Sequence, residues 1–194
     1  MNQLDSIKKQ FAYYQHLGHF TFNQLDDSQL FWQFNEESNS IAVIVQHLWG
    51  NMMSRWSDFL ISDGEKEWRN RDSEFESSLT NKEDVLEKWE EGWNCLFHAL
   101  DNLEDKDFER IIFIRNQGHT VSEALHRQMS HYAYHVGQIV YIGRMLKGNA
   151  WKSLSIPRGA SVAFNKEKFN QPKSKKHFTE EFLSGKTDEG IGEK

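Results

Sequence analysis

The sequence is poor in cysteine and in proline, and it has fewer basic than acidic residues, 23 Lys and Arg against 29 Asp and Glu. Cys95 is the only cysteine, which excludes an intrachain disulfide and a thiolate-rich metal site and fits a reducing compartment. The two prolines both follow residue 150, so nothing before that point forbids long helices. The formal net charge is −6. This balance argues against the basic surface that a nucleic-acid partner requires.

Long apolar runs are also absent. The longest stretch without a charged residue, 38–54, contains Asn, Gln and His, and the first ten residues lack the apolar centre of a signal peptide. We therefore expect a soluble, cytoplasmic protein with no membrane partner. The 194 residues are enough for one domain with a sizeable core, and two full domains would be a tight fit.

Apolar residues recur at steps of three and four in four segments, as they do in amphipathic helices. The sequence predicts these helices near 3–25, 40–61, 81–103 and 121–147. Four such helices in one domain favour an all-α fold, an antiparallel four-helix bundle. The charged connector 61–80 has no steady period and predicts a long ordered loop that crosses the bundle.

Shorter segments complete the predicted architecture. Residues 26–34 are expected to add a short helical turn, and β-branched residues broken by Gly118 predict a short extended segment or hairpin over 108–120. We take residues 1–164 as one domain with a C-terminal extension. Residues 165–194 are rich in Lys, Glu, Gly and Ser, which predicts a mobile tail.

Histidines on two of the predicted helices suggest a metal site. His131 and His135 are one helical turn apart on the inward face of 121–147, so both imidazoles can reach one ion. His47 lies in the most apolar half of the second helix, and a bundle core is where facing helices meet. Three neutral imidazoles leave a coordination position open, as in catalytic zinc sites. The pattern predicts chemistry or ligand capture at a metal ion.

Other interpretations of these histidines remain open at this point. An i, i+4 pair on an apolar face is also typical of hydrogen-bonded core residues, and His47 and His131 could be axial ligands of a haem, which leaves His135 unexplained. A carboxylate-bridged di-iron site is excluded, because the one Glu-x-x-His pair, Glu123 with His126, lies on a different face. Six histidines have no partner at ligand spacing on a core face and are expected to have surface or satisfied polar roles, namely His16, His19, His98, His119, His126 and His177.

Polar residues near the histidines are candidates for supporting roles. Asn51 and Gln128 lie one turn from His47 and His131, where they either fix the ring orientation or are ordinary buried amides. Residues 68–74, with Arg55 and Asp58, are interpreted as a solvated ion-pair cluster in preference to a lid. Two carboxylates of that segment, Asp72 and Glu74, are the candidate general bases.

With these residues in place, the chain resembles the DinB-like superfamily of bacterial metal-binding bundles. The resemblance rests on a His late in the second helical run, here SIAVIVQHLWGNMMSRW with His47, and on His-x-x-x-His-x-Gly-Gln, here HYAYHVGQ over residues 131–138. It covers about residues 1–150. The chain is similar in particular to a little-characterised branch with a GNMxSRW…DFL…DGEK…WRxRD segment, here residues 50–72.

The resemblance implies a site and a class of chemistry. His47, His131 and His135 would bind a divalent ion such as Zn, Ni, Mn or Fe. Members of the superfamily include transferases and isomerases that work with bacillithiol or mycothiol, so a thiol S-transferase or a hydrolase acting on a small electrophilic substrate is the leading expectation, with a low-molecular-weight thiol as partner. The alternative is a non-catalytic, stress-related bundle that binds a metal or ligand. A homodimer is compatible with either.

Overall fold

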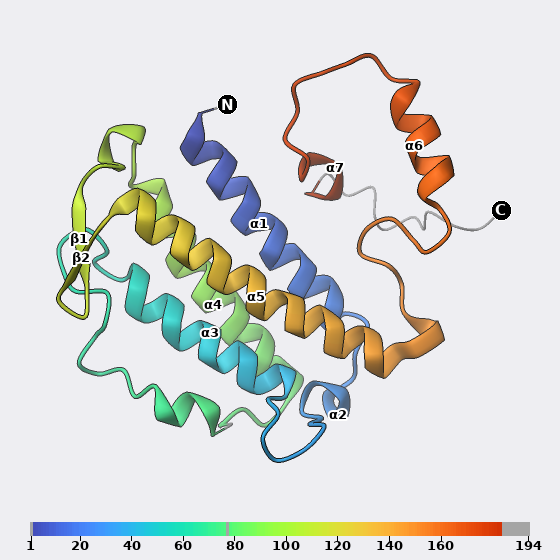
Figure 1. Ribbon diagram of the computed structural model, residues 1–194. Helices are drawn as coiled ribbons and strands as arrows, with labels where there is room; N and C mark the ends of the chain where they lie inside the picture. Colours follow the sequence, from blue (N-terminus) through green and yellow to red (C-terminus); the bar gives the residue numbers. More distant parts are fainter. Residues whose placement is uncertain (1, 77, 184–194) are drawn as a thin grey trace.

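The computed structural model describes residues 2–76 and 78–183, and it is mostly helical, with 61% of these residues in helices. Four long helices lie side by side (Figure 1): α1 (Gln3–Phe22), α3 (Ile41–Trp56), α4 (Lys82–Asp101) and α5 (Val121–Lys147). The one sheet within the described residues is a two-stranded hairpin. The expected all-α class is therefore confirmed. No helix in the described ranges is long and apolar enough to cross a membrane.

The starts of the four long helices follow from their capping residues. The side chains of Asn2, Ser40, Asn81 and Thr120 each accept a hydrogen bond from the backbone N–H three residues further on. At Thr120 the capping is reciprocal, because Glu123 accepts the backbone N–H of Thr120 in return. Each start lies within one residue of the position that the sequence predicted.

The second long helix is shorter than predicted, because α3 ends at Trp56 and not at 61. The Ser54 hydroxyl and the Arg55 guanidinium both donate to the carbonyl oxygen of Gly64, which folds the chain back against the last turn of α3. Asp58 adopts a φ of 50°, which a helix cannot contain. These contacts between α3 and the following loop have no periodic pattern in the sequence.

Short elements occupy the connections. A helical turn, α2 (Asp27–Leu30), follows α1 as predicted, and the α3–α4 connector contains one 3₁₀ turn, η1 (Asp72–Phe75). A second 3₁₀ turn, η2 (Asp105–Asp107), precedes the predicted hairpin of β1 (Ile111–Ile114) and β2 (Gln117–Thr120), and a third, η3 (Gly148–Ala150), follows α5.

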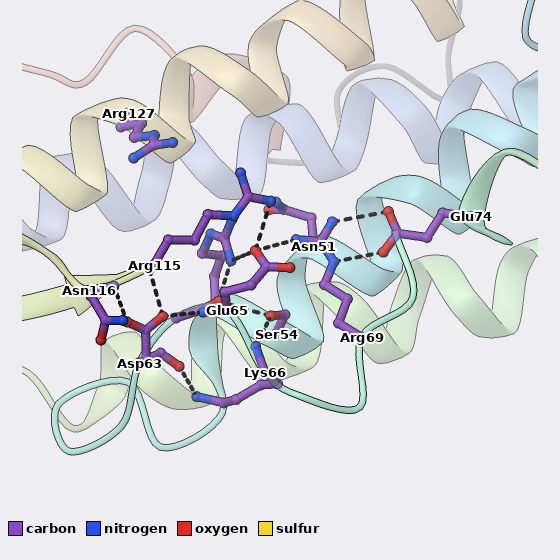
Figure 2. A network of polar contacts seen from close by, with 12 residues as sticks. Asn51, Ser54, Asp63, Glu65, Lys66, Arg69, Glu74, Arg115, Asn116 and Arg127 are labelled. Carbon is purple, nitrogen blue, oxygen red and sulfur yellow. Dashed lines mark hydrogen bonds and ion pairs between the residues drawn. The ribbon is translucent and has the colours of Figure 1, made fainter. Parts of the chain in front are cut away.

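The hairpin turn is held by a residue from the α3–α4 connector. Arg115 and Asn116 both have positive φ, 56° and 59°, as a two-residue turn of this twist requires. Their backbone N–H groups donate to the two carboxylate oxygens of Asp63, each at 2.8 Å. These hydrogen bonds attach the hairpin to the connector at one end of the helices (Figure 2).

Large aromatic side chains fill the centre of the core. Trp89, Trp93, Tyr132 and Phe11 are all essentially inaccessible, and Phe11 and Trp93 pack against the Tyr132 ring at centroid distances of 5.8 and 5.7 Å. Tyr132 follows His131 on α5, and the centroids of the two rings are 5.6 Å apart. The packing therefore fixes the rotation of α5 and with it the direction of the two histidines beside Tyr132.

The C-terminal segment is anchored on α1. It contains α6 (Ser161–Phe169) and α7 (Glu180–Leu183), and the ring of Tyr13 packs against Phe178 and Phe182 at 5.7 and 5.3 Å. Thr179 is fully buried there. The predicted mobility of 165–194 is not tested by these contacts, and residues 184–194 lie outside the described residues.

Candidate metal centre

The three histidines predicted as ligands converge in the structure. One nitrogen from each of His47, His131 and His135 lies within 4.8 Å of the other two. The Nε2 atoms of His47 and His131 are 3.3 Å apart. Ligands about 2.0–2.1 Å from a tetrahedral ion are separated by roughly 3.4 Å. The spacing of this pair is thus close to the spacing that a shared ion would impose.

The triad lies where α3 and α5 face one another. His47 is in the middle of α3 and is 5% exposed, because the helix is buried on nearly all sides in this region. His131 and His135 are half-buried on α5, one turn apart. The site therefore has a closed side toward the core and a more open side along α5.

Hydrogen bonds fix the orientation of two of the three rings. His47 Nδ1 donates to Glu74 Oε2, and His135 Nδ1 donates to Gln138 Oε1, each at 2.8 Å. A proton on Nδ1 leaves the lone pair on Nε2 of each ring for an ion. This pairing of an imidazole with an outer oxygen acceptor is the usual support of a histidine that binds a metal.

Glu74 reaches His47 from the α3–α4 connector and is itself held firmly. It is 5% exposed, and Arg69 donates to both of its oxygens, at 2.7 and 3.0 Å. Burial disfavours the charged form of Glu74, but the hydrogen bonds from His47 and Arg69 outweigh burial and hold the pKa of Glu74 below its ordinary value. Glu74 therefore presents a carboxylate to His47 at neutral pH.

Two residues of α3 place this carboxylate. Gln46 Nε2 donates to the backbone carbonyls of Ser73 and Glu74, at 3.0 and 3.2 Å, which ties η1 to the helix. Gly50 lies one turn after Gln46, and a Cβ at that position would overlap Glu74 Oε1. The connector can approach α3 this closely because the Gln46 amide bonds to its backbone and because Gly50 has no side chain.

Arg55, Arg69 and Glu74 belong to a buried network, so the interpretation as a solvated ion-pair cluster was wrong for these residues, whereas Asp58, Arg71 and Asp72 are exposed. Glu65 Oε2 accepts from the guanidiniums of Arg55 and Arg69, at 2.9 and 3.4 Å, and forms an ion pair with Arg115 Nη2 at 3.2 Å. The side chains of Arg55 and Arg69 are only 6% and 2% exposed. Figure 2 shows Arg69 between Glu65 and Glu74. The ion pairs between these side chains compensate the free-energy cost of removing their charges from water.

The imidazoles on α5 are kept neutral. Burial, with smaller contributions from His135 and His47, lowers the pKa of His131 to about 3. Burial also lowers the pKa of His135 to about 4, although the hydrogen bond to Gln138 opposes this. Neutral imidazole is the form that binds a metal ion, so these two ligands need no deprotonation at pH 7.

The two amides that the sequence placed beside the triad have other surroundings. Asn51 Oδ1 accepts from the Tyr132 hydroxyl at 3.0 Å, and that hydroxyl accepts from Trp56 Nε1 at 2.9 Å. Gln128 is buried, and its Oε1 has no hydrogen-bond partner within the described part of the chain. The oxygen atoms that orient the triad rings belong to Glu74 and Gln138.

The two candidate general bases differ in environment. Asp72 is exposed on η1, whereas both oxygens of Glu74 are occupied by His47 and Arg69.

Phe75, the residue after Glu74, stacks on the His47 ring at a centroid distance of 5.1 Å. The turn η1 therefore covers His47 with one aromatic ring and holds it with one carboxylate.

Part of this site has a signal in the sequence. The i, i+4 histidines and the buried His47 mark the candidate ligands, and Gln138 at i+3 from His135 is at hydrogen-bonding distance on a helix. Glu74 is 27 residues from His47, and Arg69 lies in the same irregular loop. Gln46 precedes His47 on α3, and its side chain donates to that loop. No helical or strand periodicity predicts their contacts.

The comparisons with known proteins support the assignment to a family and go no further. No curated protein that was compared matches the chain, and no solved structure does. Residues 1–160, most of the chain and all of the residues of the histidine site, match one family of proteins. The chain belongs to that family, whose description is "Protein of unknown function (DUF1572)".

Proposed function

We propose that the chain is a DinB-like protein that binds a divalent metal ion, Zn, Ni, Mn or Fe, through His47, His131 and His135. The observation that carries this proposal is the convergence of three ligand nitrogens within 4.8 Å, from two helices. The arrangement of four long helices is the one expected of such a protein. The His-x-x-x-His-x-Gly-Gln motif is the sequence feature that supports it.

The surroundings of the triad fit such an ion. Two of the rings have their Nδ1 atoms engaged by oxygen acceptors, and the facing Nε2 atoms of His47 and His131 would otherwise require a shared proton at 3.3 Å. The negative charge of Glu74, one ring away, would partly balance the charge of a dication. The low pKa values of His131 and His135 keep them available to the ion.

A divalent ion held by three neutral imidazoles would acidify a water or thiol ligand, which is the chemistry needed for hydrolysis or S-transfer. The residues of the chain would supply the rest. Glu74, with both oxygens bound, is suited to hold His47 and not to accept a proton from substrate. Asp72, exposed on the same turn, remains the candidate general base of the proposal. A small electrophilic substrate and a low-molecular-weight thiol are the proposed partners.

The first experiment measures the metal content of protein purified without a chelator or a nickel column. We expect about one equivalent of a divalent ion in the wild type and none in His135→Ala. Both should keep the same helical circular dichroism, because the buried stripe of α5 does not include His135. The matched control is His126→Ala, an exposed histidine on the same helix, which should keep its metal.

The second experiment tests the reaction. Metal-loaded wild type and His135→Ala are compared on a panel of small electrophiles, first with water alone and then with an added thiol. A rate that requires the thiol selects S-transfer, and a rate with water alone selects hydrolysis. Absence of bound metal in the wild type, or equal metal in His135→Ala, would refute the proposed site. Bound metal without turnover would leave a metal-binding protein and reject the enzyme.

A further inference from the structure

The charge of the chain is divided very unevenly. Residues 1–150 contain 14 Lys and Arg against 23 Asp and Glu, a net charge of −9. Residues 151–177 contain seven Lys and Arg against one Glu, a net charge of +6. We call residues 151–177 the basic arm. An acidic domain with a basic segment is a pattern that indicates an acidic partner for that segment.

The basic arm is exposed along nearly its whole length. All seven of its cationic residues are exposed, and α6, which lies within it, buries no residue. Figure 1 shows α6 at the edge of the molecule, apart from the four long helices. The cationic residues are Lys152, Arg158, Lys166, Lys168, Lys173, Lys175 and Lys176.

The arm also exposes apolar side chains, which a solvated charged segment does not need. Val162 and Phe169 are 82% and 85% exposed, and they are seven residues apart, so they lie on one face of α6. Lys166 lies between them along the helix. Phe178, just beyond the arm, is 57% exposed. Apolar and cationic groups are thus presented together.

The arm is fixed at both ends. At its start, Lys152 N–H donates to Gln24 Oε1 at 2.7 Å, and the Trp151 ring lies beside Gly143 of α5. At its far end, His177 Nε2 contacts the Ser6 hydroxyl at 3.1 Å. The two prolines of the chain, Pro157 and Pro172, bracket α6. These contacts hold the arm in place while its cationic and apolar side chains remain exposed.

We propose that the basic arm adsorbs to membrane surfaces that carry anionic lipids, with Val162 and Phe169 of α6 in the headgroup layer and the lysines against the phosphates. Charge complementarity selects an anionic surface, and the exposed aliphatic side chain of Val162 selects a bilayer over a nucleic acid, since it offers no face for stacking a base. Because residues 1–150 carry a negative net charge, the anionic surface would repel them.

This inference does not depend on the metal site. It also differs from the expectation that the protein has no membrane partner, which rested on the absence of a segment long enough to span a bilayer. Adsorption to a surface requires no such segment, only cationic and apolar groups that are exposed together. Lys168, which pairs with Glu181, is expected to contribute least.

The test is co-sedimentation of the full chain with vesicles of phosphatidylcholine, with and without phosphatidylglycerol, in the presence of a chelator. Binding is expected only to the vesicles that contain phosphatidylglycerol, and it should be lost at high salt. Replacing Lys173, Lys175 and Lys176 by Gln should weaken binding about a hundredfold, from roughly fivefold per lysine. Val162→Ser with Phe169→Ser should weaken it about tenfold or more.

The matched control replaces three lysines of the acidic part, Lys8, Lys88 and Lys106, by Gln, which changes the net charge by the same amount and should leave vesicle binding intact. Circular dichroism establishes that each variant is folded. The proposal is overturned if wild type does not sediment with the anionic vesicles at low salt, or if the control triple loses as much binding as the arm triple. Tighter binding to a single-stranded oligonucleotide, unaffected by the Val162 and Phe169 substitutions, would assign the arm to nucleic acid instead.

Discussion

Glu74 is the residue whose substitution should most directly affect the geometry of the triad. In Glu74→Gln the side chain keeps its size but loses the charge that pairs with Arg69 and faces His47. We expect the affinity for a divalent ion to fall by about 10- to 100-fold, the usual effect of removing an outer partner of a metal-binding histidine. Competition with a chelating dye measures the change.

Asp72→Asn is the control for that substitution, because Asp72 is exposed on the same 3₁₀ turn. It should leave metal affinity unchanged. If turnover is detected and Asp72→Asn removes it without loss of metal, Asp72 acts as the general base. Equal metal affinity in wild type and Glu74→Gln would contradict the assigned role of Glu74.

The two histidines of α5 should give the metal-free protein a pH-dependent stability. Their pKa values in the folded chain, about 3 and about 4, lie below the ordinary value of 6.5 expected when it is unfolded. The unfolded chain therefore binds protons first as pH falls. The free energy of unfolding should be insensitive to these groups above about pH 6.5 and should decrease as pH falls below it.

Urea unfolding at several pH values, with a chelator present, measures this dependence. In a variant with His131→Gln and His135→Gln the decrease between pH 6.5 and 5 should be smaller. The lowered pKa of Glu74 affects stability only in more acidic solution, so this window reports on the histidines. An identical slope in both proteins would show that the two imidazoles are not shielded from protons.

Among the elements, α3 carries the tightest requirement for a small residue near the site. In Gly50→Ala the new Cβ would overlap the Glu74 side chain, so that carboxylate must move from its position beside His47. We expect a loss of about 1–3 kcal/mol in unfolding free energy, as for other overpacked positions, together with weaker metal binding. Denaturant unfolding and the dye titration measure the two effects.

Gly137 provides the matched control, because it is also within a helix and a Cβ there would meet nothing within 4 Å. Gly137→Ala should therefore stabilise the protein by about 0.5–1 kcal/mol and leave metal affinity unchanged. If both alanine variants behave alike, the space at Gly50 is not what positions Glu74.

The elements themselves were largely predictable from the sequence. Apolar steps of three and four located α1, α3, α4 and α5, and in the structure the capping side chains of Ser40 and Thr120 fix two of their starts. The end of α3 was not predictable, because it depends on Gly64, which accepts from Ser54 and Arg55 across a loop. Helical periodicity describes one face of one helix and contains no information on such contacts.

The candidate site was predictable to the same extent. The spacing of His131 and His135 and the apolar surroundings of His47 identified the three histidines that converge in the structure. The burial of Arg69 and Glu74 was not predictable, because a charged segment without periodicity is normally solvated. In this protein the charges of the connector satisfy one another, and only the folded arrangement shows which carboxylate meets which guanidinium.

For the whole molecule, the C-terminal segment should contribute stability but no ligand. Removal of residues 161–194 leaves the part that matches the family and takes Phe178 and Phe182 away from Tyr13. We expect a loss of roughly 1–3 kcal/mol, in the range for aromatic contacts, with metal content unchanged. Thermal unfolding and metal analysis of the shortened chain test this. Loss of metal would place the segment in the architecture of the site.

Asp63 has a consequence for the dynamics of the molecule. Asp63 lies more than 50 residues before the tip of the hairpin, at Arg115 and Asn116, and binds the backbone of that tip. It thereby joins the hairpin to the connector that carries Glu74. Amide hydrogens at the tip of a surface hairpin normally exchange with solvent water almost freely. These two should exchange slowly and at the same rate as the connector, so that deuterium uptake at a distant turn would report the opening of the loop that supports His47.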